Sequence, residues 1–140
     1  MSQPDVVEVV LVEDQVADAQ LILRALRAKN LGNNVLWLRD GAQALEFLLR
    51  SGRYAEPRVE RHLKLVLLDV KLPKVDGIEV LQAIRATAEL RSLPVVMLTS
   101  SPERLTENLA ALDSRLDQIW RSSGASQRAC GMALTVRTTA

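Results

Sequence analysis

Short apolar runs alternate with amphipathic segments along the first hundred residues. Four runs rich in Val and Leu predict strands that are buried on both faces of a parallel sheet: Val6–Val12, Val35–Leu38, Leu65–Leu68 and Pro94–Leu98. Between and after them, helical spacing of apolar residues predicts four helices: Gln15–Lys29, a segment from Asp40 to Ser51, Gly77 to about Thr87, and one that starts at Ser101. This alternation of strands and helices favours an α/β fold with a doubly wound parallel sheet.

The pattern breaks in two places. Residues Arg53 to His62 are charged, contain a proline and lack apolar periodicity, so they predict a long surface loop. After Asp113, a short and poorly patterned fifth strand is expected at Leu116 to Trp120. A polar stretch follows, and Met132 to Thr138 then alternates like a lone strand, without an amphipathic fifth helix.

Composition narrows the class of protein. The chain has 140 residues, 48% of them apolar, which fits one domain with a real core. The net charge of +1 gives no electrostatic reason to expect a nucleic acid or an anionic membrane as partner. The chain has one cysteine, Cys130, no signal-peptide pattern and no apolar run long enough to span a bilayer, so we expect a soluble cytoplasmic protein.

Carboxylates follow two of the predicted strands. Glu13 and Asp14 come directly after the first strand, and Asp69 ends the third. The carboxyl ends of parallel strands meet at one edge of the sheet, where open α/β proteins bind ligands. Taken alone, Glu13 and Asp14 could be helix-capping acids, and Asp69 could be a turn residue. Together they predict a site for a divalent cation, and an all-oxygen ligand set favours Mg²⁺.

Three separated motifs now resemble one family. Glu13-Asp14 after the first strand, Asp69 with Leu72-Pro73-Lys74-Val75-Asp76-Gly77 behind it, and Thr99-Ser100 after the fourth strand are similar to a response-regulator receiver domain. The resemblance covers residues 6 to about 113. It implies a flavodoxin-like sheet of strand order 2-1-3-4-5.

The resemblance also implies a role for each site residue. Asp69 would accept a phosphoryl group from a phosphohistidine of a sensor histidine kinase. Glu13 and Asp14 would hold Mg²⁺ directly or through water, and Asp69 and the main-chain oxygen of Lys71 would complete the protein ligands. Thr99 would form a hydrogen bond with a phosphoryl oxygen and move inward on activation.

A finer resemblance concerns the partner. The loop from Arg53 to His62, Asp40-Gly41 and the apolar second helix together resemble the stand-alone regulators that work with bacterial and cyanobacterial phytochromes. This implies a phytochrome-type sensor kinase as partner. With no room for an output domain, such a regulator would act by binding other proteins or by relaying phosphate. A homodimer is expected, formed through the fourth helix, the fifth strand and the tail.

The chain departs from the family after Asp113. Receiver domains carry a Lys-Pro pair after the fifth strand, with an aromatic residue three positions before the Lys. No single register supplies both here, and Arg121 is the candidate substitute cation. We therefore expect a receiver domain at residues 1–123 and an atypical tail at 124–140. The tail is either an arm exchanged between two subunits or an altered reading frame, and the sequence leaves both explanations open.

Two other functions compete with phosphorylation-controlled signalling. A degenerate receiver could act only as a dimerisation or docking module, although the presence of Glu13, Asp14 and Asp69 opposes this. An aspartyl phosphatase of the haloacid-dehalogenase type would need a second Asp two residues after the first, and Lys71 occupies that position. We therefore expect no enzyme beyond one that catalyses its own phosphorylation and dephosphorylation.

Overall fold

A computed structural model of the chain describes residues 6–28, 34–55, 60–98 and 133–136. Strands and helices alternate through most of this range, as the apolar pattern predicts. The strands are β1 (Val6–Val12), β2 (Val35–Leu38), β3 (Glu60–Asp69), β4 (Val95–Leu98) and β5 (Ala133–Val136). The helices are α1 (Val16–Ala28), α2 (Gly41–Leu48) and α3 (Gly77–Ala86), and a short 3-10 helix spans Gly52–Tyr54.

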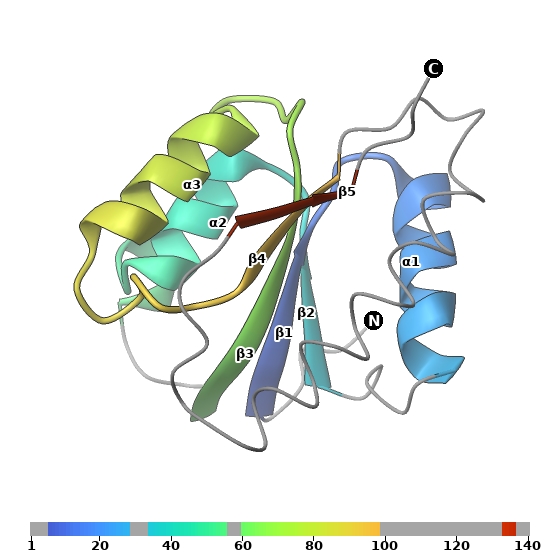
Figure 1. The fold of residues 1–140 in the computed structure, drawn as a ribbon, viewed down its shortest axis with the longest axis horizontal. Coiled ribbons are helices and arrows are strands. Elements are labelled where there is room, and N and C mark those ends of the chain that lie inside the picture. The colour runs from blue at the N-terminus through green and yellow to red at the C-terminus, as the bar shows by residue number, and fades with distance from the viewer. Residues whose placement is uncertain (1–5, 29–33, 56–59, 99–132, 137–140) are drawn as a thin grey trace.

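The five strands form one parallel sheet in the order β2-β1-β3-β4-β5. Helix α1 covers one face, and α2 and α3 cover the other (Figure 1). The expected doubly wound topology is therefore confirmed. In the helices that the structure describes, no segment has the length and apolar character needed to cross a membrane.

Each face of the sheet has its own apolar core. The α1 face is packed by residues such as Leu11, Ile22 and Leu67, with Trp37 half-buried against them. The opposite face is packed by residues such as Phe47, Leu68 and Ile84. All six of the core residues named here are at most 1% exposed. Burial on both faces explains why these strands are continuous apolar runs rather than alternating ones.

The predicted loop from Arg53 to His62 is wrong at its end, because β3 already begins at Glu60. Val6 pairs with Glu60 and Val7 pairs with Arg61, so the start of β1 serves as a template for these polar residues. The Arg61 guanidinium also stacks over the Phe47 ring, 3.9 Å from its centroid. Backbone pairing and this cation–π contact fix an extended segment that has no apolar pattern.

The fifth strand lies in the tail. Ala133 to Val136 pairs with β4, from Val95↔Ala133 to Leu98↔Val136, at the edge of the sheet (Figure 1). The segment expected to form this strand, Leu116 to Trp120, lies outside the described residues, as does the helix expected from Ser101. The alternation noted at Met132 to Thr138 thus marks a strand of the sheet itself.

Candidate functional site

Acidic side chains from two neighbouring strands meet at the carboxyl edge of the sheet. Glu13 and Asp14 follow β1, and Asp69 is the last residue of β3. Each of the three contributes a carboxylate oxygen, and these oxygens all lie within 4.8 Å of one another. The structure therefore brings together the three acids that the sequence analysis selected.

Glu13 is the buried member of this acidic cluster, with 3% of its surface exposed. Its backbone amide donates to the carbonyl of Leu38 at the end of β2 (3.0 Å), which extends the β1–β2 pairing by one residue. Its Oε1 accepts a hydrogen bond from the amide of Gln15 at 3.0 Å. The side chain is thus held toward the start of α1, while Asp14 is partly exposed.

Asp69 is fixed by the turn that follows β3. The amide of Lys71 donates to Asp69 Oδ1 at 3.1 Å, and the amide of Gly77 donates back to the carbonyl of Val70 at 3.0 Å. A Cβ atom at position 77 would collide with the main-chain oxygen of Asp69. Only glycine permits this close approach, so the Asp76-Gly77 pair closes the loop behind Asp69.

Burial and crowding determine the protonation of the acidic cluster. The pKa of Glu13 is raised from 4.5 to about 8, chiefly by loss of water, with a smaller contribution from the negative charge of Asp69. The pKa of Asp69 is also raised, chiefly by burial, while the amide of Lys71 opposes this rise. The two carboxyl groups lie close enough to interact, which raises the pKa of Glu13 and opposes the rise in the pKa of Asp69. Without a cation, the proton therefore resides on Glu13.

The loop between β3 and α3 is anchored on the start of α2. The amide of Gly41 lies 3.4 Å from the carbonyl of Pro73, and a Cβ at position 41 would collide with the carbonyl of Val75. Asp40 caps α2 by accepting from the amide of Gln43 (2.8 Å), and its Oδ2 lies 3.5 Å from Lys74 Nζ. The second half of the loop, which follows the predicted ligand Lys71, is therefore fixed against the start of α2.

Sequence reasoning did not identify the contribution of β2 to the site. Trp37 Nε1 donates to the carbonyl of Glu13 at 2.8 Å, a contact that the sequence pattern does not indicate. Asp40 and Gly41 start a helix as predicted, and they also contact the loop after Asp69. The segment Trp37-Leu38-Arg39-Asp40-Gly41 could have indicated this contribution, because it places polar groups at the end of a strand that adjoins the first strand. Thr99 and Arg121, the other predicted site residues, lie outside the described residues.

The acidic cluster has the donor set of a hard divalent cation. Oxygens that share one such ion at 2.0–2.6 Å are separated by at most roughly 5 Å, and the three carboxylate oxygens meet this limit. A cation would also replace the proton on Glu13, and so relieve the repulsion between the three carboxylates. The residues therefore fit a divalent metal ion.

Comparison with known proteins agrees with this geometry. Residues 9–119 match the family model described as "Response regulator receiver domain". The chain is 45% identical over 95 residues to the probable methanogenesis regulatory protein FilR2 of Methanothrix harundinacea, and 42% identical over 94 residues to the response regulator Rcp1 of Synechocystis. Each alignment covers 66% of this chain, and they cover 57% and 61% of those relatives. The chain thus spans about three fifths of the length of these curated relatives.

Solved structures show the same likeness. The bacteriophytochrome response regulator AtBRR has a TM-score of 0.65 and 36% identity, over 88% of this chain and 96% of that one. The Mn²⁺-bound form of Rcp1 has a TM-score of 0.63 and 32% identity, over 84% of this chain and 94% of that one. The chain is therefore related to phytochrome-associated response regulators. With its acidic cluster at the carboxyl edge of a 2-1-3-4-5 sheet, it belongs to the response regulator receiver domain family.

Proposed function

We propose that the chain is a stand-alone response regulator that accepts a phosphoryl group on Asp69 from a sensor histidine kinase in a Mg²⁺-dependent reaction. The observation that carries this proposal is the convergence of Glu13, Asp14 and Asp69 at the carboxyl edge of the sheet. Membership of the receiver family supports it, because aspartyl phosphorylation is the chemistry expected of that family.

The reaction needs little beyond the groups already described. An oxygen of ionised Asp69 attacks phosphorus, the phosphorus–nitrogen bond of the phosphohistidine breaks, and the imidazole nitrogen keeps the electron pair. An ionised carboxylate needs no general base. Its orientation comes from the Lys71 amide, which binds Oδ1 and leaves Oδ2 as the candidate nucleophile. Positioning of this kind supplies much of the catalysis in phosphoryl transfer.

Mg²⁺ would be held by Glu13, Asp14, Asp69 and the main-chain oxygen of Lys71. When bound, the ion neutralises charge on the phosphoryl oxygens. The structure of Rcp1 is described as a Mn²⁺-bound form, and this supports a divalent cation as a ligand of the present chain. Thr99 would donate to a phosphoryl oxygen, and Arg121 would replace the family's lysine as the second cation.

A bacteriophytochrome-type histidine kinase is the partner class we propose. The likeness to AtBRR, a bacteriophytochrome response regulator, supports this assignment. The 45% identity to FilR2 is a competing indication, because that relative is named for methanogenesis. Phosphotransfer from a panel of purified histidine kinases, including a phytochrome kinase, distinguishes the phytochrome assignment from the assignment that FilR2 suggests.

We further propose that residues 124–140 act as an arm in a homodimer. β5 is the last strand of the sheet, and it is joined to β4 by a parallel ladder only four residues long. Because an exchanged element repeats the contacts it makes within one chain, the same ladder can form with β4 of a second copy. Sedimentation of the intact chain and of Thr135→Pro tests this, since proline removes an amide donor from the strand. A monomer at all concentrations would contradict the arm.

The phosphoacceptor is tested by intact mass after incubation with Mg²⁺ and acetyl phosphate. We expect one phosphoryl adduct, absent without Mg²⁺ and absent in Asp69→Asn. Asp76→Asn is the matched control, because Asp76 is an acid of the same loop that caps α3 through the Ile78 amide (2.8 Å), a bond that asparagine can also accept. An adduct that persists in Asp69→Asn refutes the assignment. No adduct in wild type favours the alternative, a docking module that works without phosphorylation.

A further inference from the structure

The end of β2 supplies two side chains that bind the backbone beneath the acidic cluster. Trp37 Nε1 donates to the carbonyl of Glu13 at 2.8 Å. Arg39 Nη2 lies 3.5 Å from the carbonyl of Asp14, at the outer limit of a hydrogen bond. Two consecutive carbonyls, belonging to the two acids that follow β1, are therefore contacted by Trp37 of β2 and by Arg39, the residue that follows β2.

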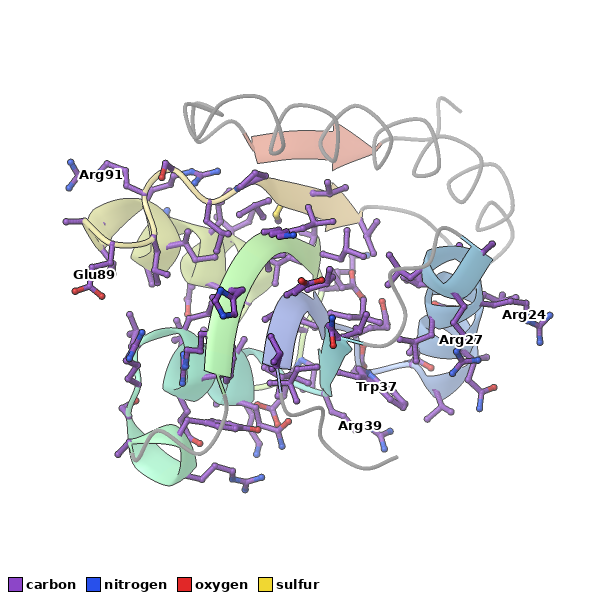
Figure 2. All side chains as sticks on the ribbon, turned by 90° about the horizontal axis from the view of Figure 1, so that it is seen from below. Arg24, Arg27, Trp37, Arg39, Glu89 and Arg91 are labelled. Carbon is purple, nitrogen blue, oxygen red and sulfur yellow. The ribbon has the colours of Figure 1, made fainter. Side chains whose placement is uncertain are left out.

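These two side chains support one another. The Arg39 guanidinium lies over the Trp37 ring, 5.3 Å from its centroid, within the range of a cation–π contact. Figure 2 shows both residues together near β2. The Trp37 ring is half-buried and packs against the core of the α1 face, so its indole nitrogen starts from a fixed position. The Gln43 side chain also fixes the backbone of Arg39, because Gln43 Oε1 accepts a hydrogen bond from the Arg39 amide at 3.1 Å.

We infer that Trp37 and Arg39 form a positioning pair that sets the direction of the Glu13 and Asp14 carboxylates. This inference rests on the proposed metal-dependent function. The peptide carbonyls of Glu13 and Asp14 are part of the turn from β1 into α1, and binding them fixes the backbone dihedral angles from which both side chains project. The backbone bond from Glu13 to Leu38 (3.0 Å) completes three successive contacts between β2 and this turn. Neither residue is itself a ligand.

The pair also has an electrostatic cost that makes its role testable. Arg39 carries a positive charge close to a site for a cation, so its charge alone weakens cation binding by repulsion. Removal of Arg39 would then tighten binding if charge were its only influence. A positioning role predicts the opposite sign, because the freed turn spends less time with both carboxylates in place.

The test measures the affinity of the intact chain for Mn²⁺, with Mg²⁺ as competitor, by the electron paramagnetic resonance signal of the free ion. Trp37→Phe removes the N–H donor and keeps an aromatic ring under Arg39. We expect about three- to tenfold weaker binding from the loss of one partly buried hydrogen bond. Arg39→Met should weaken binding rather than strengthen it. Phe47→Leu is the control for lost core packing, because Phe47 is fully buried on the opposite face of the sheet, and its affinity should match wild type.

A second measurement follows Trp37 directly. In the ¹⁵N spectrum of the Trp120→Phe protein, the indole signal of Trp37 should shift on addition of Mg²⁺ and should not shift when Asp69→Asn is also present. Wild-type affinity in Trp37→Phe, or tighter binding in Arg39→Met, overturns the positioning pair. If the wild type binds no Mn²⁺ that Mg²⁺ can displace, the proposed function is overturned, and the inference with it.

Discussion

The carboxyl groups of Glu13 and Asp69 face each other across the ends of β1 and β3, with an oxygen of each within 4.8 Å of the other, and their interaction favours the proton on Glu13. Because Glu13 is buried and Asp69 is close to it, ionisation of both carboxyl groups is unfavourable unless a cation compensates their charge. The acidic cluster is therefore a site with two alternative occupants, a proton or a metal ion. This competition has consequences for both stability and binding.

The first prediction concerns the stability of the metal-free protein. The pKa of Glu13 rises from 4.5 to about 8 on folding, so the folded state binds more protons than the unfolded state between these values. The resulting stability is fully present below about pH 4.5 and is lost as pH rises through about 8. We expect the free energy of unfolding in EDTA to fall between pH 5 and 8, by on the order of 3 kcal/mol for this group. Urea unfolding at several pH values measures it.

Glu13→Gln is the matched variant for this prediction. Glutamine keeps the size and a hydrogen-bond donor toward Asp69 but cannot ionise. Its unfolding free energy should change less with pH than that of wild type, and at pH 8 the variant should be the more stable protein without metal. Equal pH dependence of the two proteins would show that Glu13 is already ionised in the folded state.

The second prediction concerns the pH dependence of metal binding. Because the proton on Glu13 must leave before a cation is bound, Mg²⁺ affinity should rise by up to about tenfold per pH unit from pH 6 to 7 and level off near 8. Calorimetry in two buffers with different ionisation enthalpies should detect about one proton released per ion at pH 6.5. Affinity that is constant from pH 6 to 8, without proton release, would contradict this account.

The third prediction compares two glycines. Gly41→Ala places a Cβ against the main-chain carbonyl of Val75, which cannot move without displacing the loop after Asp69. We expect a loss of about 2 kcal/mol or more in unfolding free energy, together with weaker Mg²⁺ binding. Gly52→Ala is the control, because its Cβ would meet only the flexible end of the Glu46 side chain at a φ of +55°. That variant should lose about 1 kcal/mol and keep its metal affinity. Equal metal affinity in both variants would show that the position of the loop after Asp69 does not affect metal binding.

How much of this was predictable from sequence depends on the range of the interactions. The bounds of β1 and β2 and the three acids follow from local patterns, because apolar runs and carboxylates at strand ends are visible in single segments. The start of β3 at Glu60 was missed because it depends on pairing with Val6, more than fifty residues earlier in the chain. The contact between Gly41 and Val75 was missed for the same reason. The assignment of the fifth strand to the tail depends on which later segment pairs with β4, and no local sequence pattern shows this.

The last prediction concerns Lys74, whose backbone adopts φ = 67° although it is not a glycine. That conformation costs about 1–2 kcal/mol for an L-residue. The ion pair with Asp40 offsets little of it, because the Lys74 side chain is 68% exposed and water screens the charges. Lys74→Gly should therefore equal wild type or exceed it by up to about 1 kcal/mol in unfolding free energy, whereas Lys74→Ala loses the ion pair and keeps the strain. The difference between the two variants isolates the backbone cost. If alanine proves as stable as glycine at this position, the strained turn after Pro73 does not exist in solution.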